Sequence, residues 1–537
     1  MARSGNEYLA RQNLRLVNDK PLLYYIIKTS LEFKNADVYV TTDSEEIKEL
    51  SLMYGSEVIL RPKLLTKQST TLEYISFHAL TLLSKKNIHY QKCLLITPKF
   101  PLIKKSTIKD FFKNLDIKVN TIFGYLNNFD KSQKINNLKN NIEQLNDISF
   151  PVADVKKIVS FNCDQFLKSK QFTKPFFGQK LSNYEYFTLL NYHDIGVLET
   201  LLKRKKILIR VDGSREIGLG HIYNMLTILN NFRNDDLLIV MNSSKQLGSN
   251  LLKEHLYKIK FFSSHKQLQN IIEKFKPDII FNDILNTSIE YMIFLKNLSC
   301  FVVNFEDLGS GKKHANLVFN AIYFSKSKNR NEFYGNNFAA VRDEFRIWES
   351  HVFKPKVNRI LITFGGSDPT NRTQQILKII STLDVKQIEF TVILGLGYSH
   401  KKSLEPLINS MRKNGFQIKI VEKSHFLAKY FRESDFAIAS NGRTIFELAA
   451  LRIPVIAIPV NKRELHHSFV LHADVGFQII PNKKNSENEF VNAFNLMLNP
   501  KKRQYFIKNL KKLDLLNGVN LITNKINQEF EKYKTMK

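Results

Sequence analysis

A histidine that follows two glycines at the start of a helical pattern is well suited to acid–base chemistry. Gly218, Gly220 and His221 stand between an aliphatic run and a helical pattern. Glycines let backbone amides approach a ligand closely, and a helix N-terminus favours negative charge there. The positive end of the helix dipole disfavours imidazolium, which leaves a neutral base available. The same residues would also suit a glycine turn with a surface histidine, so both interpretations stay open here.

The elements on either side of this loop would hold the histidine in place. Residues 207–211 form the aliphatic run expected of a buried parallel strand, and Arg210 and Asp212 lie near its end. After the loop, apolar residues recur at helical spacing: Ile222, Met225, Leu226, Leu229 and Phe232. This order of strand, loop and helix would place His221 at the carboxyl edge of a sheet, where ligands bind in open α/β folds.

Length and composition limit the classes of protein that fit. The 537 residues predict about three domains, since domains usually hold roughly 100–200 residues each. The sequence has no run of about 18 apolar residues, and its N-terminus lacks the apolar core of a secretory signal. Three cysteines, Cys93, Cys163 and Cys300, fit neither a disulfide framework nor a zinc site. We therefore expect a cytoplasmic protein without a transmembrane helix.

The charge is the unusual feature of the composition. Lys and Arg outnumber Asp and Glu by 80 to 50, which gives a formal net charge of +30. Such a charge suits nucleic acid, anionic lipid or phosphorylated small molecules. The densest basic stretch, 501–512, has the spacing of a solvated helix face, and no nucleic-acid-binding motif accompanies it. We expect phosphorylated small molecules as partners and no specific nucleic acid, and the basic surface also suits peripheral membrane association.

Residues 1–203 alternate strand and helix patterns, which predicts an α/β domain with a mainly parallel sheet. Motifs occur in order at 3–13, 20–22, 42–47, 61–62 and 101–102. With them this part of the chain resembles the cytidylyltransferases that activate nonulosonic (sialic acid-like) sugars as CMP derivatives. By this resemblance the nucleotide-binding residues are Arg3, Gly5, Arg11, Asn13 and Asp43. The family opens with a strand that has no counterpart before Arg3, so we expect the natural start to lie further upstream.

Several positions where this family carries its chemistry differ here. Glu7 stands where a lysine would meet the triphosphate, and Thr97 replaces a glutamine near the base. Asn191 and His193 stand where two aspartates would hold Mg²⁺, which prefers hard anionic oxygen ligands. The resemblance implies CTP or a CMP-sugar as the ligand of this domain, and Mg²⁺ as its cofactor only if the domain is active.

From residue 204 the alternation of strands and helices begins again. Polar residues follow the expected strands, at Asn282, Asp283, Glu306 and Asp307. In a second glycine loop Gly365 and Gly366 can cradle a phosphate, and Ser367 or Asp368 could cap the helix that follows. We predict two Rossmann-like halves, residues 204–350 and 351–515, and a C-terminal basic helix over residues 516–537.

The segment 434–459 predicts a buried strand, a turn, a short helix and another buried strand. Thr444 and Glu447 have the spacing of a capping box. Alternatively, Glu447 accepts hydrogen bonds from ribose hydroxyls, as acidic residues do in nucleotide-binding folds. Both interpretations stay open. The other candidate binding residues of this cleft are Gly442, Arg443, Asn461 and Glu464.

Residues 206 to about 480 resemble the UDP-sugar hydrolases of pseudaminic acid biosynthesis and their spore-coat polysaccharide relatives, which share the two-domain GT-B architecture. The motifs that carry the resemblance are 210–214, 217–221, 364–369, 441–444 with 447–451, 461–464 and 467–469. The resemblance implies that His221 is a catalytic base that activates water, and that Asp212 orients it or contacts the sugar. Gly366, Thr444 and Glu447 would hold the nucleotide of a UDP-sugar.

One departure from this family bears on the reaction. Asn224 stands where the family commonly carries an arginine, three residues after the histidine. The spacing of the residues does not distinguish water from a sugar acceptor, so a hydrolase and a glycosyltransferase both fit, and His221 favours the hydrolase. A non-catalytic nucleotide-sugar binder is the alternative for the first domain. None of these interpretations requires a metal or another cofactor in the second module, and none predicts an oligomeric state.

Overall fold

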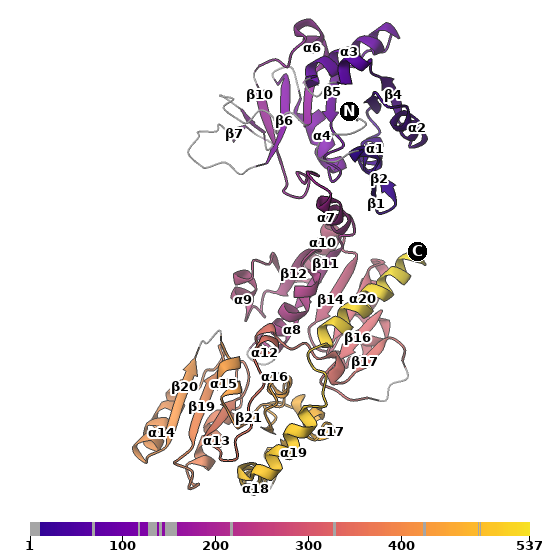
Figure 1. The fold of residues 1–537 in the computed structure, drawn as a ribbon. Helices are drawn as coiled ribbons and strands as arrows, with labels where there is room; N and C mark the ends of the chain where they lie inside the picture. Colours follow the sequence, from indigo (N-terminus) through magenta and orange to yellow (C-terminus); the bar gives the residue numbers. More distant parts are fainter. Residues whose placement is uncertain are drawn as a thin grey trace. The chain divides into compact units, whose positions relative to one another are not determined.

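In the computed structural model the chain divides into two compact units, residues 1–203 and 204–537, and each is described by itself. Figure 1 shows that both combine helices with β-sheets. The structure describes residues 11–66, 70–115, 119–126, 137–138, 142–144, 158–174, 176–214, 218–325, 329–422, 426–481, 483 and 485–536.

The first unit contains a two-stranded parallel sheet, a six-stranded sheet and a short hairpin. The larger sheet has the order β5-β9-β6-β10-β8-β7. The strands are β1 (Leu16–Val17), β2 (Lys20–Pro21), β3 (Tyr39–Thr42), β4 (Glu57–Leu60), β5 (Lys92–Ile96), β6 (Thr121–Leu126), β7 (Asn137–Leu138), β8 (Ile142–Gln144), β9 (Ile158–Asn162) and β10 (Phe176–Leu181). The helices are α1 (Leu22–Leu31), α2 (Glu45–Met53), α3 (Leu72–Lys85), α4 (Lys105–Asn114), α6 (Cys163–Ser169) and α7 (His193–Leu202).

The predicted α/β class of this unit is confirmed, but its larger sheet is mixed rather than mainly parallel. β6 and β10 run parallel, whereas β9 runs antiparallel to both β5 and β6. Alternation of strands with helices favours parallel pairing, but it does not fix the direction of each strand in a sheet.

The first half of the second unit is built on a seven-stranded parallel sheet with the order β13-β12-β11-β14-β15-β16-β17. These strands are β11 (Lys206–Val211), β12 (Asp236–Asn242), β13 (Ile259–Phe262), β14 (Ile279–Asp283), β15 (Phe301–Phe305), β16 (Leu317–Asn320) and β17 (Glu332–Tyr334). The helices of this half are α8 (Gly220–Leu229), α9 (Ser249–Glu254), α10 (His265–Phe275) and α11 (Ile289–Asn297).

Different helices cover the two faces of this sheet. On β11, Ile207, Ile209 and Val211 belong to the core that α8 completes. Leu208 points to the opposite face, into the core beneath α10 and α11. Because successive side chains of a strand alternate between faces, a residue's parity decides which of the two layers it meets.

The second half repeats the design with a six-stranded parallel sheet of order β20-β19-β18-β21-β22-β23. Its strands are β18 (Arg359–Thr363), β19 (Glu389–Leu394), β20 (Gln417–Glu422), β21 (Phe436–Ala439), β22 (Val455–Ala457) and β23 (Gly476–Gln478). The helices α12 (Asp343–Ile347), α13 (Arg372–Ile380), α14 (Lys401–Lys413), α15 (Ala428–Arg432), α16 (Thr444–Ala450), α17 (Phe469–His472), α18 (Ser486–Leu498) and α19 (Pro500–Leu510) accompany it. The predicted pair of Rossmann-like halves is confirmed.

The C-terminal helix α20 (Gly518–Thr535) is part of the first half's core rather than a basic tail. Val519, Ile522, Ile526 and Phe530 are buried in the same cluster as the apolar face of α8. In Figure 1 the yellow α20 lies beside the strands of the first half. The helix is rich in lysine, but its apolar residues recur at spacings of three and four residues and so form one buried stripe.

Within the part of the chain that the structure describes, no helix is both long and apolar enough to cross a membrane.

Replacing Gly518 by alanine should destabilise the second unit. An added Cβ would lie 2.1 Å from the Ala339 backbone oxygen, a contact that requires the backbone to move. We expect Gly518→Ala to lower the free energy of unfolding by about 1–3 kcal/mol, measured by urea denaturation. Gly196→Ala is the matched control, because nothing lies within 4 Å of its added Cβ. That change should stabilise α7 by about 0.5–1 kcal/mol, and equal unfolding curves for both variants would contradict the close packing of α20.

Candidate functional site

His221 lies in the first turn of α8, above the carboxyl ends of β11 and its neighbour β14. Gly218 precedes it with a φ of 73°, a left-handed conformation that favours glycine. An added Cβ on Gly220 would lie 3.6 Å from the Arg443 side chain, which comes from the second half. The predicted strand–loop–helix arrangement is therefore present, and the loop lies where the two halves meet.

The ring of His221 is held by a buried carboxylate. Its Nδ1 lies 2.5 Å from Asp283 Oδ1, and the Asp283 side chain is fully buried at the end of β14. An ionised carboxylate accepts a proton-bearing nitrogen, so Nδ1–H donates to Asp283 and the lone pair of neutral imidazole is left on Nε2. The His221 side chain is 11% exposed, so the ring is not sealed in the core. This geometry suits a general base that takes a proton through Nε2.

Asn224 links this pair to the second half. It lies three residues after His221 on the same face of α8, and its Nδ2 donates to Asp283 Oδ2 over 2.7 Å. Its Oδ1 accepts a hydrogen bond from the Arg443 guanidinium. Nη1 of Arg443 also donates to Glu306 Oε1 over 3.0 Å. One continuous network therefore runs from His221 to Glu306 and includes an arginine of the opposite half.

Asp212 does not orient His221, which corrects one of the two predicted roles of this residue. Asp212 is buried, and its Oδ1 accepts the backbone N–H of Asn242 over 3.0 Å. The carboxylate thus joins the end of β11 to the end of β12, while Asp283 on β14 holds the histidine. Asp283 was predicted only as a binding residue, and the structure gives it the orienting position.

Arg210 and Asn282 lie on the face of the sheet opposite His221, so the structure does not bring these predicted binding residues to it. Arg210 has the parity of Leu208, and its guanidinium lies 4.4 Å from the Tyr291 ring centroid. Asn282 accepts from the Tyr291 hydroxyl over 2.8 Å and donates to Asn304 over 2.9 Å. Their side chains serve the packing of α11 against the sheet.

The glycine loop of the second half faces the loop of His221. Gly365 has a φ of 74°, and an added Cβ on Gly366 would lie 3.3 Å from the Leu219 backbone nitrogen. Similarly, a Cβ on Gly218 would lie 3.9 Å from Ser367 Oγ. Gly218, Gly366 and Ser367 are therefore brought together, as their motifs predict.

The first turn of α13 is satisfied by Asp368 rather than by Ser367. Asp368 accepts the backbone N–H groups of Arg372 and Thr373 over 2.7 and 2.9 Å. Its carboxylate thus meets two of the otherwise unpaired donors of a helix N-terminus. This leaves the Ser367 side chain without a capping task, and its role as a binding residue stays a prediction.

Glu447 forms an ion pair with Arg342 instead of a capping box. Arg342 donates to the two carboxylate oxygens through Nε over 2.6 Å and through Nη2 over 3.0 Å. The guanidinium also lies 4.6 Å from the ring centroid of Tyr223 on α8. Among the described residues, no side chain caps the N-terminus of α16, the helix that begins at Thr444. Nucleotide binding by Thr444 and Glu447 stays a prediction, and Glu447 would accept ribose hydroxyls while it is paired with Arg342.

Glu464 supports the turn that carries Gly442. Its Oε2 accepts the backbone N–H groups of Asn441 and Val460 over 3.0 and 3.1 Å, and Asn461 accepts the N–H of Glu464 itself over 3.0 Å. Burial raises the pKa of Glu464 to about 7. Asn461 and Glu464, predicted as binding residues, thus hold the shape of the loops around β21 and β22.

Two residues that sequence reasoning did not select also join the halves. Arg463 donates to the Tyr323 hydroxyl through Nε over 2.5 Å, and its Nη2 donates to the Glu306 backbone oxygen. Burial raises the pKa of Tyr323 to about 12, so its hydroxyl keeps its proton near neutral pH. Glu306, which the sequence analysis names among the polar residues after the expected strands, follows β15 at the edge where Asp283 ends β14. Arg463 lies within a motif that carries the family resemblance, whereas nothing in the sequence signals Tyr323.

The N-terminal candidates are only partly placed. Arg3 and Gly5 lie outside the described residues. Arg11 is exposed and pairs with Glu46 over 2.5 Å, and Asp43 pairs with the buried Arg61 over 3.0 Å. Asn13 is buried. Their role in nucleotide binding and the upstream opening strand both stay predictions.

The residues at the expected Mg²⁺ positions do not fit a metal. Asn191 Oδ1 accepts the backbone N–H groups of His193 and Asp194 over 2.9 and 3.3 Å. Asp194 Oδ2 accepts those of Leu190 and Asn191 over 2.6 and 2.9 Å. The described residues contain no cluster of three metal-ligating side chains. The side chains at these positions shape the start of α7, which leaves only one carboxylate for a cation that prefers several.

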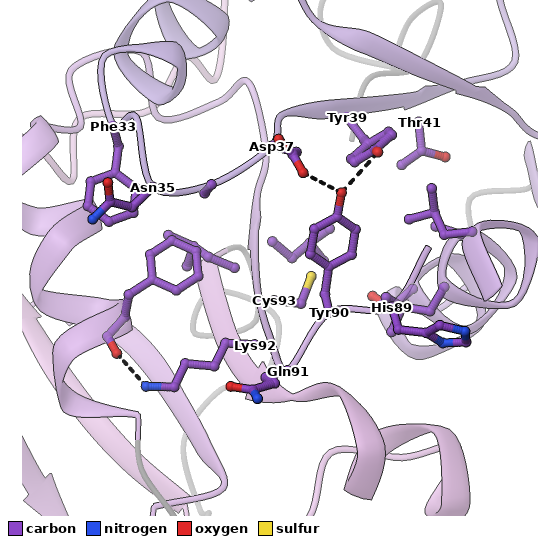
Figure 2. A pocket seen from close by; sticks show the side chains of 18 of the residues that line it. Phe33, Asn35, Asp37, Tyr39, Thr41, His89, Tyr90, Gln91, Lys92 and Cys93 are labelled. Carbon is purple, nitrogen blue, oxygen red and sulfur yellow. Dashed lines mark hydrogen bonds between the residues drawn. The ribbon is translucent and has the colours of Figure 1, made fainter. Parts of the chain in front are cut away.

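A cavity of about 710 Å³ lies beside the starts of β3 and β5 in the first unit. Figure 2 shows the Tyr90 hydroxyl between Asp37 and Tyr39, at 2.5 and 3.0 Å. Burial raises the pKa of Cys93, which lines the cavity, to about 12 and keeps this thiol protonated. Asp43 follows the opposite, carboxyl end of β3, so this cavity is not the predicted nucleotide site.

Fold and site together define an α/β protein in which a domain with a mixed sheet is followed by two Rossmann-like halves that share one site. Residues 1–207 match the family model described as cytidylyltransferase. This match confirms the resemblance of the first 203 residues.

The chain is also similar to one protein over most of its length and to others over a little more than half of it. The "pseudaminic acid cytidylyltransferase and UDP-2,4-diacetamido-2,4,6-trideoxy-beta-L-altropyranose hydrolase" of Helicobacter pylori is 24% identical over 502 residues, which cover 87% of this chain and 89% of that protein. An uncharacterized protein of Methanocaldococcus jannaschii is 29% identical over 320 residues, which cover 56% of this chain and 62% of that protein. The solved structure of MurG from Acinetobacter baumannii aligns with 60% of this chain and 99% of its own, at 13% identity and a TM-score of 0.44.

The pKa of Glu464 makes stability depend on pH. Its folded-state pKa of about 7 exceeds the ordinary 4.5, so the folded state retains a proton that the unfolded state loses between these values. Stability is therefore lost as pH rises through this window. We expect Glu464→Gln to remove this loss, so that the melting temperature of the unchanged protein falls relative to the variant from pH 5 to pH 8. If the melting temperatures of the two proteins changed with pH in parallel across this range, the raised pKa of Glu464 would be refuted.

Proposed function

We propose that residues 204–537 remove UDP from a UDP-linked acetamido sugar by hydrolysis, in the biosynthesis of a nonulosonic acid or another surface glycan. The observation that carries this proposal is the His221–Asp283 pair, at 2.5 Å, beside the two facing glycine loops. The similarity to the Helicobacter pylori fusion protein over most of the chain supports both the nucleotide and the sugar class. No metal enters the proposed step.

Each group would have one task in the proposed reaction. Water gives a proton to His221 Nε2 as its oxygen bonds to the sugar, and UDP leaves with the electron pair of the broken bond. Asp283 stabilises the imidazolium that forms, because its carboxylate already accepts Nδ1–H. Arg443 holds a positive charge next to Asn224, the position where the resembling family carries its arginine, and can stabilise the departing diphosphate.

A glycosyltransferase is the second candidate, because a sugar hydroxyl can give its proton to His221 as water does. The two reactions differ in whether UDP release requires an acceptor. We expect UDP release from UDP-2,4-diacetamido-2,4,6-trideoxy-β-L-altropyranose in buffer alone. Release that begins only when an acceptor glycan is added would support the transferase instead.

Removal of the base should abolish turnover while leaving nucleotide binding intact. We expect His221→Ala and Asp283→Asn to lower kcat for UDP release by about a hundredfold or more, since a positioned general base contributes roughly 10²–10⁴. UDP affinity, measured by calorimetry, should stay within about twofold, because neither side chain is assigned to the nucleotide. Full turnover by His221→Ala would overturn the assignment of the base.

For the first unit we propose nucleotide binding without cytidylyl transfer. The support is that Asn191 and Asp194 are bonded to the backbone at the start of α7. We expect no pyrophosphate release from CTP, Mg²⁺ and a nonulosonic acid, and measurable CMP-sugar formation would refute this proposal. The double variant Asn191→Asp, His193→Asp restores the carboxylates of the resembling family. Pyrophosphate release by this variant alone would identify these two positions as the cause.

A further inference from the structure

Glu306 carries a hydrogen-bonding group that the protein itself does not use. Its side chain is 5% exposed, and Oε1 accepts Arg443 Nη1 over 3.0 Å and the Ala321 backbone N–H over 3.2 Å. Among the described residues, no group forms a hydrogen bond with Oε2, which is buried. A buried polar atom without a partner costs free energy, so such atoms are rare in folded proteins.

Neither protonation state of Glu306 resolves this cost. As a carboxylate, Oε2 lacks a donor, and as a carboxylic acid its proton lacks an acceptor. Burial raises the pKa of Glu306, and Asp283 raises it further while Arg443 lowers it. His221 also affects this pKa, so the carboxyl group belongs to the same site as the proposed base.

The backbone at Glu306 gives a second, independent indication. Its φ is 51°, a left-handed conformation that residues with a Cβ rarely adopt. Strain of this kind is often retained where a side chain must be presented in one direction. The Arg463 guanidinium donates to the Glu306 backbone oxygen, which holds the residue from the second half as well. The protein therefore fixes Glu306 from both halves, yet leaves one oxygen unused.

We propose that Glu306 is a substrate-binding residue whose Oε2 accepts an N–H of an amide substituent on the sugar, while Arg443 beside it donates to the carbonyl of the same substituent. An amide offers one donor and one acceptor side by side, and a carboxylate next to a guanidinium offers the complementary pair. Among the described residues Arg443 donates two hydrogen bonds, to Glu306 and Asn224, and a guanidinium carries five N–H groups.

This inference rests on the proposed UDP-sugar site and deepens it, since it selects acetamido sugars over sugars that carry a hydroxyl at the same carbon. A site built around a hydrogen bond rejects a ligand that lacks the partner, because the buried group is then left unpaired. Amide binding and proton transfer would be connected, because Arg443, which would bind the amide, also contacts Asn224, which donates to Asp283.

The test compares three probes by calorimetry on the full chain, namely UDP, UDP-glucose and UDP-N-acetylglucosamine. The unchanged protein should bind UDP-N-acetylglucosamine at least about tenfold more tightly than UDP-glucose, as expected for one satisfied hydrogen bond to a charged group. Glu306→Gln keeps the shape but presents an amide, and should erase this preference while UDP affinity stays within about twofold. Glu306→Asp keeps the charge, withdraws it by one methylene and should have the same effect.

Glu332→Gln is the matched control. Glu332 is also a buried carboxylate of the first half, but Lys312, Tyr334 and Asn329 already donate to it over 2.9, 2.7 and 2.7 Å. Its substitution should leave the preference for the acetamido probe unchanged. If Glu306 variants keep the preference, or lose UDP affinity to the same extent, the inference is overturned. If the unchanged protein binds neither UDP nor a UDP-sugar, the proposed function fails and this inference fails with it.

Discussion

The burial of the Asp283 carboxylate is the constraint on which the candidate site depends. A fully buried carboxylate must have its oxygens hydrogen-bonded, because an unpaired buried charge is costly. His221 and Asn224 meet this requirement from one face of α8, at 2.5 and 2.7 Å. The rotation of α8 about its axis is thereby coupled to the strand beneath it. The apolar residues of α8 pack against the sheet in the same orientation, so packing and charge specify one arrangement.

The same network explains why asparagine is compatible with position 224. An amide can donate to Asp283 through one end and accept from Arg443 through the other, which no arginine can do. An arginine at 224 would bring a second positive charge against the Arg443 guanidinium, and like charges at short range repel. In this chain the positive charge comes from the opposite half, so its presence beside the histidine depends on how closely the halves approach.

The sequence was sufficient to predict the α/β class, the two Rossmann-like halves and the meeting of their glycine loops, because each depends on local patterns of apolar residues and glycines. It was not sufficient to predict which polar residues pair. Asp212 and Asp283 both end neighbouring strands, and only the positions of the helix and of Asn242 decide which one meets His221. The family resemblance places Arg210 in the site, but the side chain lies on the other face of the sheet, with the parity of Leu208. The alternation of side chains along a strand predicts this placement from the sequence alone.

Arg342 and Glu447 show how one ion pair serves both fold and site. They are 105 positions apart in the chain, and no spacing signals their contact. Ribose binding is one of the two roles that the sequence predicts for Glu447. A carboxylate paired with both Nε and Nη2 of an arginine is held in a fixed orientation. Each of its oxygens still has a second lone pair, so the pair can accept ribose hydroxyls without breaking. The guanidinium also packs on Tyr223 of α8. A nucleotide bound at Glu447 would therefore be connected through Arg342 and Tyr223 to α8, the helix that carries His221.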